Sequence, residues 1–152
     1  MTRSIDGLHH LGLTVRDVDE SAAWYERVLG FTRTGGWDDP ARRWRKAFLT
    51  HAGLRTRLGL VEHTARGDGP FDETRTGLDH LAFGVTDRAD LDDWCEHLTE
   101  QDVAWSPIAD SNSIPGACVV VFRDPSNIQL ELFYDPTAIG DESEGEPSSN
   151  RS

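Results

Sequence analysis

The chain has 152 residues, of which 37% are hydrophobic and 28% charged, a balance typical of a folded globular domain. Its net charge of −12 repels phosphate backbones and anionic membranes, so the composition argues against nucleic-acid or membrane partners. The sequence shows no secretory signal pattern and no apolar run of the ~20 residues that span a membrane, so we expect a cytoplasmic protein. Cys95 and Cys118 match no zinc spacing and are expected to be free thiols.

The chain contains a long internal repeat. When the sequence is shifted by 70 positions, residues of the first half fall on identical residues of the second half. The matched pairs include His10 with His80, Leu11 with Leu81, Val15 with Val85, Asp17 with Asp87, Trp24 with Trp94 and Glu26 with Glu96. Two copies are too few for a solenoid, which needs about three repeats. The repeat therefore predicts two similar modules packed as a pseudo-symmetric pair.

In the first module, alternating bulky and small residues over 8–15 predict a strand with two different faces. A helix is expected over 21–29, because Asp17 or Asp19 can cap its start and Gly30 can end it. Further strands are expected from Phe31, over 48–50 and over 56–62.

The second module repeats this order. A strand is expected over 78–85 and a helix over 89–100, followed by strands over 103–106, 118–122 and 128–134, with a long loop over 110–116. Each half therefore has the order βαβββ, and the fold class is α+β. We expect a first module over 5–64, a linker over 65–77, a second module over 78–136 and a disordered acidic tail over 137–152.

Two histidines stand at equivalent places of the repeat. Leu11 and Leu13 share the strand face that should pack on the helix, which leaves His10 on the opposite face beside small residues. His80 has the same setting, next to Ala82 and Gly84. Small neighbours leave an open concavity over the sheet, which a ligand pocket needs. The helical Trp24 and Trp94 are instead expected to pack in the core.

The last strand places a carboxylate, Glu131, between two leucines, where it is costly to bury without a partner. Together with His10 and His80 it would form the two-histidine, one-carboxylate set that binds a divalent metal and leaves open coordination positions. The alternatives are ordinary hydrogen-bonded histidines and a Glu131 paired with an arginine. His9 is a weaker rival ligand, because it shares the helix-facing phase with Leu11.

Four segments resemble the vicinal oxygen chelate superfamily of glyoxalase I, bleomycin-resistance proteins and extradiol dioxygenases. The segments are HLGLTV at 10–15, WYERVLGF at 24–31, DHLAF at 79–83 and RDPSNIQLELF at 123–133. The resemblance implies two βαβββ modules forming a cupped, barrel-like mixed sheet with helices outside. It also implies one divalent ion, of Fe, Mn, Zn, Ni, Co or Mg, held by His10, His80 and Glu131.

The superfamily's glyoxalase I members carry a fourth ligand, a Glu or Gln on the fourth strand. Matching 58–60 to 130–132 puts Gly59 at that place, and Glu62 lies at an odd offset, on the other face of the strand. Either Glu62 or water would complete the coordination. Relatives with three ligands, the extradiol dioxygenases and fosfomycin-modifying transferases, match this ligand count better.

The resemblance implies a metal-dependent enzyme that acts on a small oxygen-rich molecule by lyase, isomerase or ring-cleaving dioxygenase chemistry, with Glu131 as the catalytic carboxylate. By strand phase, Arg57, Gln129 and Phe133 face the cup and are candidate substrate contacts. The alternative is an antibiotic-sequestering protein without catalysis. Superfamily members are commonly homodimers, so His10 and His80 of one site can come from different subunits.

Overall fold

The computed structural model describes residue 5 and residues 7–138, so most of the expected acidic tail, from residue 139 onward, lies outside the described part. The first module contains β1 (His10–Thr14), α1 (Val18–Leu29), β2 (Thr32–Asp38), β3 (Trp44–Thr50) and β4 (Arg57–His63). The second contains β5 (Leu81–Val85), α2 (Asp90–Glu100), β6 (Ala109–Asp110), β7 (Cys118–Arg123) and β8 (Gln129–Tyr134). The α+β class and the βαβββ order of each half are confirmed.

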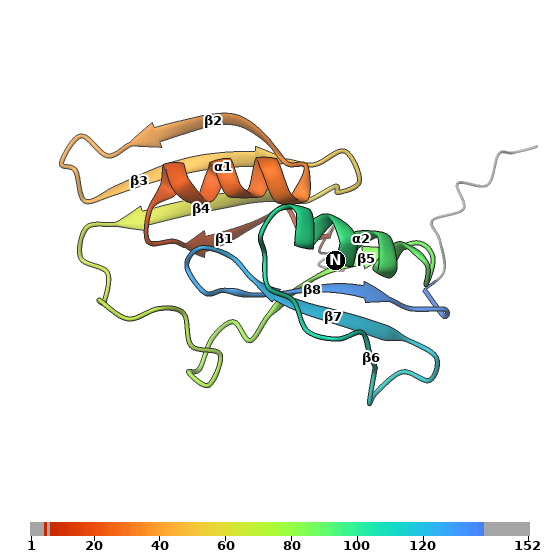
Figure 1. Ribbon diagram of the computed structural model, residues 1–152. Helices are drawn as coiled ribbons and strands as arrows, with labels where there is room; N and C mark the ends of the chain where they lie inside the picture. The colour runs from red at the N-terminus through yellow and green to blue at the C-terminus, as the bar shows by residue number, and fades with distance from the viewer. Residues whose placement is uncertain (1–4, 6, 139–152) are drawn as a thin grey trace, which may run out of the picture.

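Each module builds its own four-stranded mixed sheet (Figure 1). The strand orders are β1-β4-β3-β2 and β5-β8-β7-β6, and among the described strands β1 with β4 and β5 with β8 are the parallel pairs. The helices α1 and α2 lie beside each other, joined where the His97 Nε2 atom meets the Val28 carbonyl oxygen at 2.9 Å. Within the described chain the two sheets do not close into a barrel, so the expected barrel-like cup is present as two open sheets.

One expected strand is misplaced. Residues 103–106 form only an isolated bridge between Trp105 and Phe122, and the strand β6 begins later, at Ala109, and ends at the first residue of the stretch expected to be a loop. Pro107 explains the shift, because proline has no backbone N–H to donate to the neighbouring strand. The chain pairs with β7 at Ser106 before this proline and again at Ala109 after it.

The first helix follows its sequence signals closely. The Asp17 carboxylate accepts hydrogen bonds from the Asp19 and Glu20 backbone N–H groups, and Gly30 ends the helix with φ 70°, in the left-handed region that glycine adopts easily. The second helix starts at Ala89 without a side-chain cap. Both helices bury an apolar stripe against their sheets.

The two modules share one hydrophobic core. The ring of Trp24 stacks on Phe122 at 6.3 Å, and Phe31 meets Phe83 edge-on at 6.0 Å. The fully buried Tyr25 hydroxyl donates to the Asp124 carboxylate at 3.2 Å. Trp24 is buried as expected, but its repeat partner Trp94 is only half-buried. The expected free thiols, Cys95 and Cys118, are confirmed as buried.

Candidate metal centre

Each sheet has an inner face, which we define as the face turned away from the helices. On β1, Leu13 is buried toward α1 while His10, Gly12 and Thr14 are exposed on the inner face. On β5, the residues alternate between half-buried and exposed in the same phase as on β1. The predicted placement of the small residues on the inner faces is therefore confirmed for both modules.

Two of the three expected ligands meet on the second sheet. Register pairs Ala82 with Glu131, and His80 precedes that position by two residues on the same face. The His80 Nε2 atom lies 3.6 Å from a Glu131 carboxylate oxygen, and the Glu131 side chain is 14% exposed. The costly carboxylate thus has an imidazole beside it, as the sequence predicted.

Asp79 orients this imidazole. The His80 Nδ1 atom lies 2.6 Å from an Asp79 carboxylate oxygen, so the proton on Nδ1 is donated to Asp79 in the neutral ring. The lone pair of Nε2 then points toward Glu131. A carboxylate behind the histidine is the usual arrangement around protein metal ions. Sequence analysis did not single out Asp79, although its place directly before the repeated histidine was visible.

His10 has an equivalent brace but a different neighbour. Its Nδ1 atom lies 2.9 Å from the Nδ1 atom of His9, which occupies the repeat position of Asp79. His9 was expected on the helix-facing side, but it lies exposed. Because β1 begins only at His10, the alternation of side chains between the two faces of the strand does not extend to His9. His9 is therefore placed to orient His10.

The third ligand does not join the other two within one chain. Among the described residues, no group of three His, Cys, Asp or Glu side chains gathers closely enough to hold a metal ion. His10 lies on the first sheet, while His80 and Glu131 belong to the second. A single chain therefore carries two separate parts of the expected set.

Register also identifies what stands opposite His10 on its own sheet. Gly12 pairs with Gly59 in the first sheet as Ala82 pairs with Glu131 in the second, so Gly59 is the structural counterpart of Glu131. A side chain at Gly12 would meet no atom within 4 Å, and one at Gly59 would meet only the Leu11 carbonyl oxygen at 3.7 Å. This part of the inner face is open.

Glu62 points away from this open area. Its carboxylate accepts a hydrogen bond from the Val18 backbone N–H at 3.0 Å, at the start of α1, and lies 3.7 Å from the Arg45 guanidinium. The predicted odd offset from Gly59 is confirmed. A carboxylate at a helix N-terminus is stabilised by the exposed N–H groups there, so Glu62 has a structural role at the start of α1, on the helix side of the sheet.

The expected substrate contacts are spread over both inner faces. Arg57 is exposed and lies opposite His10 in register, and Phe133 lies opposite Gly84. Gln129 is committed elsewhere, because its amide oxygen accepts a hydrogen bond from Arg123 at 2.9 Å. The same Arg123 binds Glu73 and lowers the pKa of that carboxyl to about 2.

Aromatic side chains continue the first inner face beyond the open area. Trp37 and Trp44 lie with ring centres 4.5 Å apart, and the Lys46 ammonium stands 4.4 Å above the Trp44 ring. Trp37 and Phe48 are 47% and 42% exposed. The open area is thus flanked by an accessible apolar surface.

Comparison with known proteins identifies the family. The profile of the Glyoxalase/Bleomycin resistance protein/Dioxygenase superfamily matches residues 7–132. The chain belongs to this superfamily. A crystal structure of a glyoxylase/bleomycin resistance protein/dioxygenase domain from Frankia sp. EAN1pec is 35% identical, with a TM-score of 0.76 over 87% of this chain and 99% of that one.

Other similar proteins are more distant. Protein YwkD of Bacillus subtilis (strain 168) is 28% identical over 132 residues, which cover 85% of this chain and 97% of YwkD. The fosfomycin resistance protein FosX from Listeria monocytogenes, solved with Mn(II) and sulfate, shares the fold at 19% identity and a TM-score of 0.65, over 88% of this chain and 96% of FosX. No helix in the described part of this superfamily member is long and apolar enough to cross a bilayer.

Proposed function

We propose that the chain is a divalent-metal-dependent enzyme of the glyoxalase/dioxygenase type, acting on a small oxygen-rich organic substrate. The observation that carries this proposal is the Asp79–His80–Glu131 arrangement on the second inner face. Asp79 holds the imidazole so that an unprotonated nitrogen faces a half-buried carboxylate. Two acceptor atoms facing each other need a cation between them.

The spacing of these two atoms suits a shared ion. Ligands about 2.1 Å from one ion stand about 3.0 Å apart at a right angle and about 3.4 Å apart at a tetrahedral angle. The 3.6 Å separation of His80 Nε2 and the Glu131 oxygen lies close to this range. The rival arrangement is an imidazolium, with a proton on each nitrogen, held between Asp79 and Glu131. Metal analysis separates the two, as described below.

We further propose that the site is completed in a homodimer. One chain presents His10 on one open sheet and His80 with Glu131 on the other, so a second copy that covers the inner faces would bring the two parts together. The exposed Trp37 and Phe48 on the other strands of the same sheet support a covered surface, since large apolar side chains gain free energy on leaving water.

The side chains around the ion would then have separate roles. When bound, the ion would polarise substrate oxygen atoms and stabilise negative charge that develops on them. Glu131 stands at the reacting centre and can take part in proton transfer as well as ligation. Arg57 can meet an anionic group of the substrate, while Phe133, with the Arg123-bound Gln129 on the same strand, would form the opposite wall. With glycine at position 59, open coordination sites are left for substrate in lyase, isomerase or ring-cleaving dioxygenase chemistry.

The test is elemental analysis of protein purified without chelator. The wild type should carry one Fe, Mn, Zn, Ni, Co or Mg per chain, and His80→Ala and Glu131→Gln should lose it. The control His63→Ala removes an exposed histidine at the far end of β4, six residues from Arg57, which lies opposite His10, and it should keep the metal. Metal-free wild type under all loading conditions would contradict the proposal and leave the imidazolium arrangement.

A mixed dimer tests the sharing of the site. When one chain carries His10→Ala and the other His80→Ala, a shared geometry places both changes in one site and leaves the second site intact. The mixed dimer should therefore bind one metal ion, whereas each homodimeric variant binds none. A mixed dimer without metal would show that each site lies within one chain.

The second candidate is an antibiotic-sequestering protein without catalysis. The Trp37–Trp44 pair favours it, because accessible aromatic rings bind flat or cationic drugs by stacking and cation–π attraction. This function requires no metal. Binding of bleomycin by metal-free protein, lost in Trp37→Ala and retained in His80→Ala, would favour sequestration over catalysis.

A further inference from the structure

A hollow lies between the two modules on the helix side of the sheets, opposite the inner faces. Its inner part has a volume of about 110 Å³ and is lined by apolar side chains of both modules, among them Leu29, Phe31, Phe83, Val85 and Leu132. A second, wider and more open hollow of about 440 Å³ lies between the end of α1 and the face of α2 and shares Leu29, His51 and Trp94 with the first. The inner hollow alone is smaller than the ~150 Å³ at which apolar cavities accept a benzene ring, so a bound ring would extend toward the wider one.

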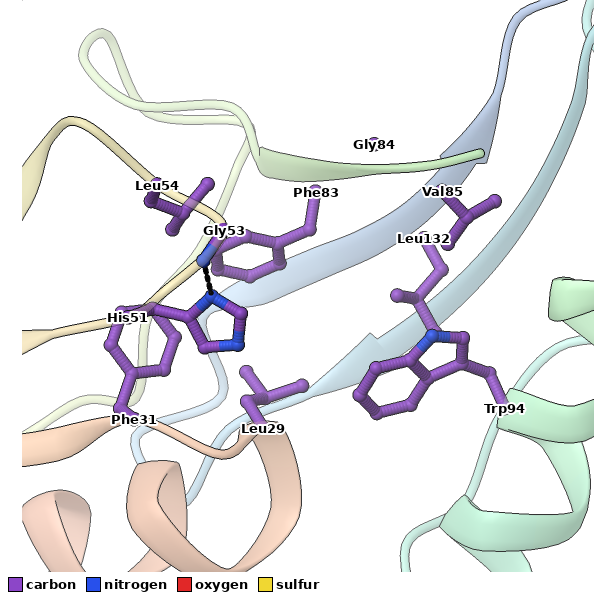
Figure 2. A pocket seen from close by; sticks show the side chains of 10 residues that line it. All are labelled: Leu29, Phe31, His51, Gly53, Leu54, Phe83, Gly84, Val85, Trp94 and Leu132. Carbon is purple, nitrogen blue, oxygen red and sulfur yellow. Dashed lines mark hydrogen bonds between the residues drawn. The ribbon is translucent and has the colours of Figure 1, made fainter. Parts of the chain in front are cut away.

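One hydrogen-bond donor faces this apolar space. The His51 Nδ1 atom accepts a hydrogen bond from the Gly53 backbone N–H at 3.0 Å, so the neutral ring carries its proton on Nε2. Figure 2 shows the His51 ring on one side of the opening and the Trp94 ring on the other, with Nε2 turned into the space between them. No described side chain or carbonyl accepts a hydrogen bond from this Nε2 atom.

The pseudo-symmetry relates His51 to a position in the second module that already has an aromatic hydrogen-bond partner. Strand registers place Phe48 opposite Gly59 and Val121 opposite Glu131, so His51 and Asp124, three residues further on, are structural counterparts. At the Asp124 position, the ring of Tyr25 fills the boundary between the two modules, which we call the seam. Its hydroxyl donates a hydrogen bond to the Asp124 carboxylate.

At the His51 position the corresponding aromatic rings are absent. The repeat places Cys95 at the position of Tyr25, and the strand registers place Leu49 at the position of Phe122. Both side chains are smaller than the rings they replace, and Cys95 carries no hydroxyl. The first module therefore presents an anchoring group whose aromatic partner the second module does not supply.

We propose that this hollow binds a small phenol, whose hydroxyl pairs with His51 as the Tyr25 hydroxyl pairs with Asp124. The ring lies between His51 and Trp94 against Leu29 and Phe83, and the phenolic oxygen accepts a hydrogen bond from His51 Nε2. The site is separate from the metal centre, because Phe83, Val85 and Leu132 face the helices while Ala82 and Glu131 face the other way. The proposal is independent of the catalytic one.

The probe is p-cresol, the side-chain analogue of tyrosine, followed by calorimetry or ligand-observed NMR, with toluene as the matched ligand without the hydroxyl. p-Cresol should bind saturably at about millimolar concentration, and toluene roughly 3- to 10-fold more weakly, the range expected for one net hydrogen bond. His51→Phe keeps the ring and removes the donor, so it should abolish the advantage of p-cresol over toluene. His63→Phe, on the exposed end of β4, should leave this advantage unchanged.

Two further variants make the test decisive. Leu54 is 39% exposed at the rim, so Leu54→Trp can fill the hollow without disturbing the fold, and it should lose both ligands even if His51→Phe does not fold. His80→Ala should bind p-cresol as the wild type does. The proposal is wrong if folded wild type shows no saturable p-cresol binding, if Leu54→Trp binds it unchanged, or if His80→Ala loses it.

Discussion

The two modules follow the same chain path but carry different chemistry at equivalent places. On the inner faces, Glu131 of the second module corresponds to Gly59 of the first. At the seam, the turn after the third strand carries Asp124 in one module and His51 in the other, and each accepts a hydrogen bond from the backbone N–H two residues later. A repeat thus preserves backbone geometry while single side chains change the chemistry at equivalent places.

The histidines show the same divergence at shorter range. His10 is braced by His9, and His80 by Asp79. Only His80 also has a carboxylate in front of its free nitrogen. Each half of the expected metal centre is therefore incomplete alone, and the asymmetry between the modules gives the two halves complementary roles.

The largest expected effect tests whether the modules unfold as one unit. Leu60 and Leu132 are counterparts at the centres of the two sheets, 0% and 2% exposed. Leu60→Ala and Leu132→Ala should each lower the free energy of unfolding by about 2–5 kcal/mol, since a buried leucine leaves a cavity when truncated. Both should shift one common transition in urea, followed by circular dichroism. Two separate transitions would show that the shared core does not couple the modules.

The seam should be sensitive to pH through Asp124. Burial raises the pKa of Asp124 to about 6, although backbone N–H groups and Tyr25 oppose the shift. Its folded-state pKa lies above the unfolded value of about 3.9, so the folded state holds the proton longer. Stability is then fully present below about pH 4 and falls by about 2–3 kcal/mol as the pH rises through 6.

Asp124→Asn is the matched variant, because an amide keeps acceptors for the Ser126 and Ile128 N–H groups and can still bond Tyr25. Urea unfolding of both proteins from pH 4 to 7 measures the difference. The variant should lack the loss of stability that the wild type shows over this interval. Parallel pH profiles would mean that Asp124 titrates alike in the folded and unfolded states.

Gly59→Glu would make the first module resemble the second on its inner face. Position 59 has room for a side chain and no positive φ, so a carboxylate there would stand to His10 as Glu131 stands to His80. If the centre is shared between chains, metal affinity should rise by at least about tenfold, or ~1.4 kcal/mol. Val61→Glu, two residues along the same face, is the control and should give no increase in a competition titration with a chelating dye.

The smallest expected difference in stability between the modules concerns the N-termini of the two helices. Asp17→Ala removes two hydrogen bonds from the first turn of α1 and should lower stability by about 1 kcal/mol. Ala89→Asp should change it by less than about 0.5 kcal/mol, because Ala89 has φ −65° and ψ −28° rather than the extended backbone of a capping residue. Thermal unfolding of the two variants measures this difference. A gain in stability from Ala89→Asp as large as the loss from Asp17→Ala would contradict the prediction.

Local features of the sequence were predictable because they depend on near neighbours. Alternation placed His10 on the inner face, and the odd offset of Glu62 placed it toward the helix, since successive strand residues point to opposite faces. The position of β6 was not predictable in this way, because it depends on where Pro107 lets the chain pair again with β7. The bracing of His80 by Asp79 requires side-chain rotamers that the strand pattern does not specify.

The sequence by itself determined the superfamily, the doubled βαβββ architecture and the residue types at the proposed metal positions, because repeats, periodicity and motifs are properties of the chain alone. Only the tertiary structure decided that Glu131 meets His80 and not His10, that Gln129 is held by Arg123, and that a hollow remains between His51 and Trp94. These outcomes depend on how two sheets are placed relative to each other, which is the sum of many distant contacts and is not encoded in any one segment.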